Sequence, residues 1–110
     1  MKKTNKYGNK QVEHKGMVFD SKKEFERYLY LKSREDNGEI FDLETQVKIN
    51  IIPKTDKFRK MDYYADFVYT EDGKTIIEDV KGYRKEAAYK IFKIKQKLIY
   101  YLYGFEIREV

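Results

Sequence analysis

The chain of 110 residues contains no cysteine and no tryptophan, only one proline and one histidine, and no apolar run long enough to cross a membrane. The absence of cysteine excludes disulfides and zinc sites built on thiolates. A transmembrane helix needs roughly 20 consecutive apolar residues, so we expect no membrane partner. The basic first six residues are not followed by an apolar stretch, which argues against a secretory signal. We therefore expect a cytoplasmic protein, in the cytoplasm of a host cell if a phage encodes it.

The composition is that of a folded, basic, single domain. Hydrophobic residues make up 41% of the chain and aromatic residues 16%, with eleven tyrosines, which is enough apolar material for one core. The net charge is +5. Lysine and arginine are concentrated in residues 1–15 and 81–97, whereas the acids lie mostly between residues 24 and 79. This asymmetry favours a polyanionic partner such as DNA; solvated helix faces and a flexible tail are the alternative explanation.

The order of predicted elements gives the fold class. Residues 1–15 lack an apolar period and are predicted to be a flexible basic arm, and residues 16–110 a single domain. After a short extended piece, the pattern predicts, in order, a helix at 21–37, strands at 40–52, 61–70 and 74–81, a helix at 85–103 and a short last strand. The order α-β-β-β-α-β predicts an α/β (α+β) domain, in which a mixed sheet is flanked by helices.

Helical spacing predicts which faces of the two helices are buried. The sequence Ser21-Lys22-Lys23-Glu24 is a capping-box pattern, and Gly38 is suited to end the first helix. Residues spaced three or four apart form one face of a helix. The predicted apolar face of the first helix is Phe25, Tyr28, Leu29 and Leu31, and that of the second is Ala88, Ile91, Ile94, Leu98 and Leu102.

Two acids face each other on the predicted hairpin. Asp72-Gly73 between alternating apolar runs is a strong signal for a two-residue type I′ turn. This turn pairs Glu71 with Lys74 and places Asp66 opposite Asp79. Because side chains alternate along a strand, Lys81 shares the face of Asp79.

Opposed carboxylates are unfavourable unless a cation lies between them. Apolar residues occupy both faces of this hairpin, so Asp66 and Asp79 are expected to be partly covered and to need partners. A divalent metal that activates water at a phosphate would be such a partner, which points to a nuclease. The alternative is an ordinary solvated hairpin face on which Lys81 neutralises the acids.

Glu24 has two competing explanations. As the third residue of the capping box it would reach back to the Ser21 amide and stabilise the start of the helix. It also shares a helical face with Tyr28 and Leu31, so its carboxyl can point to the sheet and complete a metal site.

The ordered set of acids resembles the PD-(D/E)XK nuclease superfamily. That superfamily has the core order α-β-β-β-α-β, an acid on the first helix, an Asp on the second strand and Asp/Glu-x-Lys on the third, and the matching residues here are Glu24, Asp66, Asp79 and Lys81. Ala65 stands where the superfamily name has proline, and Glu78 beside Asp79 is a second candidate acid, although strand parity favours Asp79. A closer likeness, to a family of small phage proteins labelled as a domain of unknown function, rests on residues 19–24, 38–40, 64–67 and 78–82.

The superfamily resemblance implies Mg²⁺ chemistry, with Mn²⁺ as a substitute. Asp66 and Asp79 would hold the metal with the backbone carbonyl of Val80, and Glu24 would bind directly or through water. Lys81 would orient the attacking water or stabilise charge on the phosphate. Two further residues, Gln96 and Tyr100, match the Gln-x-x-x-Tyr motif of RecB-like members.

We expect the basic segments to contact DNA phosphates. The candidates are Lys6, Lys10, Lys15, Arg84, Lys85, Lys90, Lys93 and Lys97. His14 is expected to be a DNA contact or inert rather than a catalytic base.

The expected substrate is branched DNA, with a four-way junction as the leading choice and a Holliday-junction-resolvase-like role in phage recombination or replication. Symmetric cutting of a junction requires a two-fold dimer, for which Tyr100, Tyr101 and Tyr103 are candidate contacts. The rival hypotheses are a nicking or repair nuclease of the same fold, a catalytically silent DNA-binding protein on a nuclease scaffold, and a protein-interaction module.

Overall fold

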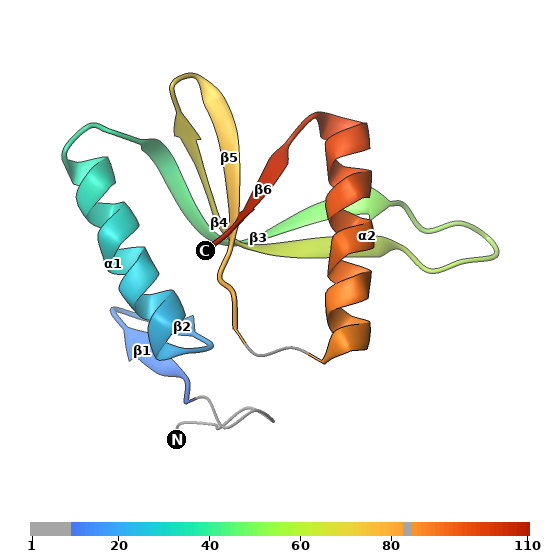
Figure 1. The fold of residues 1–110 in the computed structure, drawn as a ribbon, viewed down its shortest axis with the longest axis horizontal. Coiled ribbons are helices and arrows are strands. Elements are labelled where there is room, and N and C mark those ends of the chain that lie inside the picture. The colour runs from blue at the N-terminus through green and yellow to red at the C-terminus, as the bar shows by residue number, and fades with distance from the viewer. Residues whose placement is uncertain (1–9, 83–84) are drawn as a thin grey trace.

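The computed structural model describes residues 10–82 and 85–110 (Figure 1). The predicted DNA contacts Lys6 and Arg84 lie outside the described residues. The elements are β1 (Val12–His14), β2 (Met17–Phe19), α1 (Lys22–Asp36), β3 (Phe41–Ile52), β4 (Met61–Glu71), β5 (Lys74–Asp79), α2 (Glu86–Tyr103) and β6 (Glu106–Glu109).

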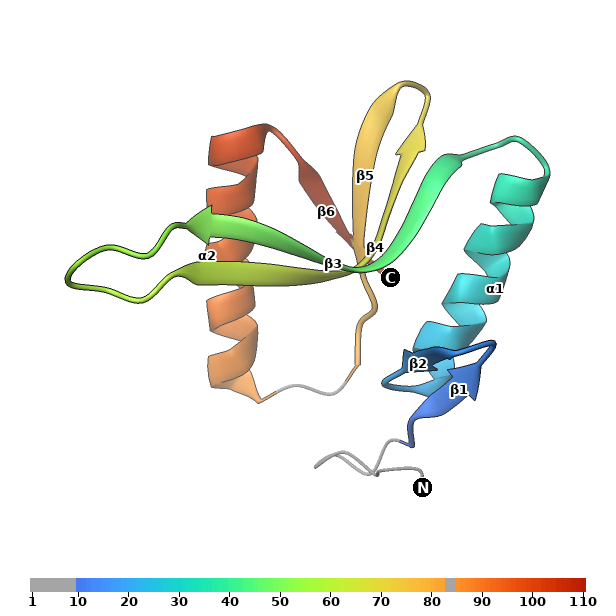
Figure 2. The same ribbon diagram turned by 180° about the vertical axis from the view of Figure 1, so that it is seen from behind.

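A mixed four-stranded sheet forms the centre of the molecule. Its strand order is β3-β4-β5-β6, in which the first three strands are antiparallel and β6 runs parallel to β5. Figures 1 and 2 show α1 and α2 on either side of this sheet. The predicted α+β class is confirmed, and at this coarse level the architecture is that of a restriction-endonuclease-like fold. In the described ranges, no helix combines the length and the apolar character needed to cross a membrane.

The β4–β5 hairpin has the predicted register. Glu71 pairs with Lys74, and the ladder runs to Phe67 opposite Glu78. Asp72 and Gly73 have φ values of 52° and 76°, as a type I′ turn requires at both central positions. The next register position after Phe67–Glu78 brings Asp66 opposite Asp79, as expected from the sequence.

Helix α1 begins as its capping residues predict. The Ser21 hydroxyl accepts a hydrogen bond from the Glu24 backbone N–H at 3.1 Å, and Gly38 follows the helix with φ 75°. Leu31 is completely buried, but Leu29 is 44% exposed. The prediction of Leu29 as a core residue is therefore wrong, because the apolar face of α1 is narrower than the sequence suggested.

The predicted flexible arm is too long. Strands β1 and β2 form a small antiparallel hairpin in which Val12 pairs with Phe19 and His14 with Met17. Its turn contains Gly16, whose φ of 82° suits a glycine. The His14 ring lies 5.1 Å from that of Phe25 on α1, so residues 12–14 belong to the folded domain. A two-residue Lys-Gly turn between short strands is the signal that the arm prediction overlooked.

The buried face of α2 also differs from the prediction. The core residues of this helix are Phe92 and Ile99, with Tyr89 and Leu98 packed beside them. Of the five residues predicted to be buried, four are exposed and only Leu98 contacts the core: the exposed ones are Ala88, Ile91, Ile94 and Leu102. Both faces of α2 carry apolar residues at helical spacing, so the period alone selected the wrong one.

Two hydrophobic clusters divide the core between the helices. The cluster beneath α2 contains Ile51, Tyr63, Ala65, Ile77, Phe92, Ile99 and Ile107, and the cluster beneath α1 contains Phe19, Leu31, Ile40, Phe67, Tyr69 and Ile76. Along β4, Tyr63 and Ala65 join the first cluster, whereas Phe67 and Tyr69 join the second. The change occurs around Asp66, although Val68 still packs against the first cluster. Figures 1 and 2 show β3 and β4 bending near the middle of the molecule.

Candidate active site

Glu24 lies in the first turn of α1 and is buried, with 4% of its surface exposed. Its Oε1 accepts a hydrogen bond from Nε2 of Gln46 at 2.5 Å. Burial and the nearby carboxylates of Asp66, Asp20 and Asp79 together raise the pKa of Glu24 to about 8, against a partial opposing effect of the Asp20 backbone. The carboxyl group therefore lies in the field of the hairpin acids, while the Ser21 cap acts on the Glu24 backbone. The Ser21 half of the predicted capping box is therefore present, whereas the Glu24 side chain bonds to Gln46 of the sheet.

The two hairpin acids are held by groups from the sheet. Oδ2 of Asp66 accepts a hydrogen bond from the Val80 backbone N–H at 2.7 Å. Asp79 is 6% exposed, and its Oδ1 accepts from the Tyr63 hydroxyl at 3.2 Å. This hydrogen bond links the two strands of the hairpin at its open end, because it joins the Asp66 side chain to Val80, the residue that follows Asp79. The structure thus places the Asp66 carboxylate against the backbone next to Asp79, through the Val80 N–H rather than through the carbonyl predicted as a metal ligand.

Lys81 stands just beyond this pair. Its N–H donates to the Val110 carbonyl at 2.6 Å, and the Val110 N–H donates to the Asp79 carbonyl at 3.0 Å. These bonds continue the parallel ladder past the end of β5, so Lys81 keeps the side-chain parity of Asp79. Lys81 is exposed, and its ammonium has no hydrogen bond or ion pair within the described part of the chain. Its carbonyl accepts from Nζ of Lys23 at 2.5 Å, which joins this segment to α1.

Glu78 has a different partner and is not a site acid. It is fully buried and accepts two hydrogen bonds from Arg27, at 2.8 Å from Nε and 2.7 Å from Nη2. The Tyr69 hydroxyl donates to the same carboxylate at 2.5 Å, and this contact together with burial raises the pKa of Tyr69 to about 12. The choice of Asp79 over Glu78 agrees with this arrangement.

Sequence reasoning did not identify Arg27 as the residue that fixes α1 against β5. The available signal was Glu78 itself, since a carboxylate on a covered strand face requires a charged or hydrogen-bonding partner. Arg27 is one helical turn from Glu24, so the ion pair with Glu78 also sets the position of Glu24 relative to the hairpin.

The donor chemistry suits a hard divalent cation. Burial first, and then the nearby carboxylates that include Asp66 and Asp79, raise the pKa of Glu24 to about 8, so an added positive charge would stabilise this group of acids. Within residues 10–82 and 85–110, no three His, Cys, Asp or Glu side chains already form a group that could hold a metal ion. A site in which Asp66 and Asp79 are the direct ligands and Glu24 acts through water does not require three carboxylates in direct contact with the metal. Mg²⁺ prefers such sites, because it binds oxygen ligands and keeps several of its waters.

The predicted phosphate contacts occupy two regions. Lys10 and Lys15 belong to the β1–β2 end of the molecule, and the other described candidates lie at the start of α2 or along it: Lys85, Lys90, Lys93 and Lys97. Figures 1 and 2 show the β1–β2 hairpin and the start of α2 on either side of the segment that follows β5. Lys90 pairs with Glu86 at 3.2 Å and Lys93 with Glu109 at 3.5 Å. Of the predicted phosphate contacts in the described chain, those that are exposed and form no such ion pair are Lys10, Lys15, Lys85 and Lys97.

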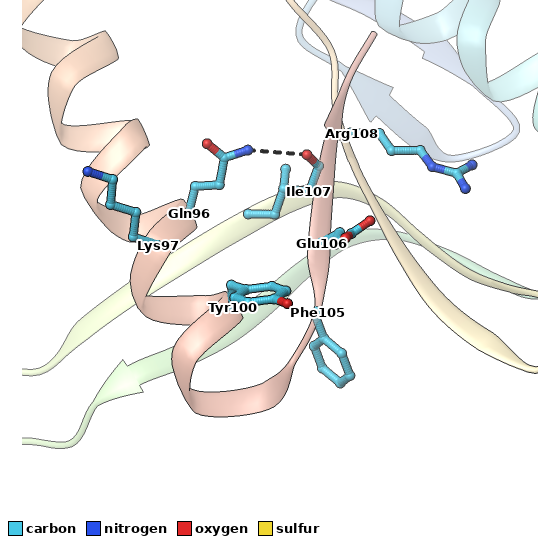
Figure 3. Close-up of a pocket in the computed structure, with 7 residues that line it drawn as sticks. All are labelled: Gln96, Lys97, Tyr100, Phe105, Glu106, Ile107 and Arg108. Atoms are coloured by element: carbon cyan, nitrogen blue, oxygen red, sulfur yellow. Dashed lines mark hydrogen bonds between the residues drawn. The ribbon is translucent and has the colours of Figure 1, made fainter.

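Gln96 and Tyr100 do not join the acids. Gln96 donates from Nε2 to the Ile107 carbonyl at 3.2 Å and ties α2 to the edge strand β6 (Figure 3). Tyr100 is 59% exposed. Both residues line a separate cavity of about 440 Å³ whose other walls are Lys97 and residues 105–108. Their role in this structure is to shape the α2–β6 edge.

Residues 4–108 match a protein family whose description is "Protein of unknown function (DUF1064)". The chain belongs to this family. The predicted closer likeness to a family of unknown function is thereby confirmed, and the match starts within the segment predicted to be an arm. Neither the curated proteins nor the solved structures contain a match to the chain.

Proposed function

We propose that this member of the DUF1064 family is a metal-dependent DNA endonuclease of the PD-(D/E)XK type. The observation that carries the proposal is the convergence of Glu24, Asp66 and Asp79 beside Lys81. Burial together with mutual repulsion leaves Glu24 with a pKa of about 8, which is the electrostatic state expected of a site that awaits a cation.

Each residue has a role that follows from its position. Asp66 and Asp79 would hold Mg²⁺ with the Val80 carbonyl, and Glu24 would bind directly or through water; Mn²⁺ would substitute. The bound metal supplies Lewis-acid polarisation of the phosphate and a lower pKa for a bound water. The exposed ammonium of Lys81 orients that water or neutralises charge that develops on the phosphoryl oxygens. Lys10, Lys15, Lys85 and Lys97 position the DNA backbone.

Branched DNA, a four-way junction first, is the proposed substrate, and the chain offers a surface for the two-fold dimer that symmetric cutting requires. The face of α2 that points away from the core exposes Ile91, Ile94, Tyr101 and Leu102. Contiguous exposed apolar residues commonly mark interaction surfaces. Of the tyrosines considered as dimer contacts, Tyr103 donates to the Asn50 carbonyl at 2.5 Å and helps anchor α2 to β3, so Tyr101 is the better candidate. The proposed setting is recombination or replication of a phage in the cytoplasm of its host.

A catalytically silent DNA-binding protein is the second candidate function. It is favoured by the hydrogen bonds that already satisfy Glu24, Asp66 and Asp79. In that case the acids would stabilise the fold, and their neutral isosteres would not reduce any activity. A nicking or repair nuclease of the same fold would share the chemistry and differ in substrate.

The test is cleavage of labelled four-way junction, flap and duplex DNA with Mg²⁺ or with EDTA. The variants are Asp79→Asn and, as a matched control, Glu26→Gln, an exposed acid on the same helix as Glu24. Junction cleavage that requires Mg²⁺ and is lost only in Asp79→Asn supports the proposal. Equal cleavage of all three DNAs keeps the nuclease and rejects the junction preference. Binding without cleavage in Mg²⁺ and Mn²⁺ rejects the nuclease.

A further inference from the structure

Gln46 has an unusual backbone for its place in the fold. It lies within β3 yet has a φ of 54°, in the left-handed region that residues with a Cβ rarely adopt. Its neighbours remain in the ladder, with Thr45 opposite Phe67 and Val47 opposite Ala65. Gln46 therefore takes the register position opposite Asp66, where the strands bend and the covering cluster changes from that of α1 to that of α2.

The side chain of Gln46 reaches the second acid of the site. Its Nε2 donates to Oε1 of Glu24 at 2.5 Å. The same residue thus lies beside Asp66 through its backbone and contacts Glu24 through its amide. Glycine would suit the backbone better and asparagine tolerates it well, but glycine has no amide and asparagine is one methylene shorter.

We propose that Gln46 is a positioning residue for Glu24, an inference that rests on the proposed nuclease function. An amide is neutral, so it orients the carboxyl of Glu24 without cancelling the charge that would attract a metal. A lysine at this position would compete with the metal for that carboxylate. Unfavourable backbone conformations persist where the surrounding structure or the function requires them. At Gln46 the function would be the hydrogen bond that its side-chain amide donates to Glu24.

The consequence concerns metal binding. Without the amide, the Glu24 carboxyl loses the contact that holds Oε1 beside the sheet and keeps its hydrogen bond to the Asp20 backbone, so its orientation toward Asp66 and Asp79 is less well fixed. Removal of groups that orient metal ligands typically weakens metal affinity or activity by roughly 10–100-fold. We expect a loss of this size in Mn²⁺ affinity and a matching rise in the Mg²⁺ concentration that gives half-maximal cleavage.

The experiment compares Gln46→Gly with Asp42→Gly. Asp42 is exposed and has a φ of 57° in the same strand, so the control removes a left-handed side chain without touching the acids. Mn²⁺ binding is measured by calorimetry without DNA, thermal unfolding is measured in EDTA, and junction cleavage is titrated with Mg²⁺. We expect the two variants to change the unfolding temperature alike, and only Gln46→Gly to lose metal affinity.

A second variant keeps the inference open to refutation if Gln46→Gly does not fold. Gln46→Met has a similar length and no charge but lacks the donor, and it should also bind Mn²⁺ more weakly and require a higher Mg²⁺ concentration for half-maximal cleavage. Wild-type Mn²⁺ affinity and cleavage in both Gln46 variants would show that the residue only bends the strand, which overturns the inference and leaves the nuclease proposal intact. A wild-type protein that neither binds Mn²⁺ nor cuts DNA would reject the proposed function itself.

Discussion

The raised pKa of Glu24 makes the stability of the protein depend on pH in a specific direction. The group has a pKa of about 8 in the folded chain against an ordinary value of 4.5. Between these values the folded state holds a proton that the unfolded state has released, so the free energy of unfolding falls as pH rises. The favourable contribution is fully present below about pH 4.5 and is lost as the pH passes 8.

The size of the effect follows from the shift. The difference between about 8 and 4.5 corresponds to an upper limit of about 5 kcal/mol, at 1.36 kcal/mol per pH unit. Local relaxation and water entry reduce this limit, so we expect a loss of about 2–3 kcal/mol between about pH 5 and pH 9. In a domain of this length that loss lowers the unfolding temperature by about 8–15 °C.

Glu24→Gln isolates the contribution of this one group. The variant removes the charge and keeps the shape, so it should match the wild type near pH 5 and exceed it in stability near pH 9. Thermal and urea unfolding in EDTA across this range provide the measurement, with Glu26→Gln as the exposed control on the same helix. Mg²⁺ should stabilise the wild type near pH 9 by more than it stabilises Glu24→Gln, because it also relieves the repulsion that acts on the ionised Glu24. Parallel profiles for wild type and Glu24→Gln over the whole range would refute the reasoning.

Further predictions concern three other features. Arg27→Met leaves Glu78 charged and buried, so it should lower the free energy of unfolding by about 3–5 kcal/mol in urea titrations, and Arg27→Met combined with Glu78→Met should recover much of that loss. Lys81→Met should reduce the cleavage rate by about 10²–10³-fold and change stability by less than about 0.5 kcal/mol, because the side chain is exposed; equal losses of both would contradict its catalytic role. Gly73→Ala places a Cβ at φ 76° and should destabilise the hairpin by about 1 kcal/mol in thermal unfolding, whereas an unchanged unfolding temperature would argue against the type I′ turn.

The parts of the fold that the sequence predicted depend on local chemistry. The Asp72-Gly73 turn fixed the register of β4 and β5 and so the opposition of Asp66 and Asp79, because this turn type allows one pairing. Ser21 marked the start of α1 because its hydroxyl can satisfy a free helix amide. The acids of the candidate site could be predicted for the same reason. The alternation of side chains along a strand and the repeat of a helical turn determine which of these residues share a face.

The features that the sequence did not predict depend on contacts between distant segments. Helix α2 has apolar residues on both faces, and only packing against the sheet selects Phe92 and Ile99 over Ile91 and Ile94. A left-handed glutamine inside a strand has no local signal, since glutamine is not a residue type that favours this conformation. The partner of Glu78 was likewise undetermined, because several basic residues of α1 were available to pair with it.

The presence of two core clusters has a consequence for how the proposed activity would be lost. Glu24 is carried by α1, which packs on one cluster, whereas Asp79 is held by Tyr63, which belongs to the other. A small displacement between the two halves would separate the carboxylates while each half retained its own packing. Loss of the proposed activity in denaturant should therefore precede loss of helical and sheet structure, since the geometry of the proposed site depends on contacts to both clusters.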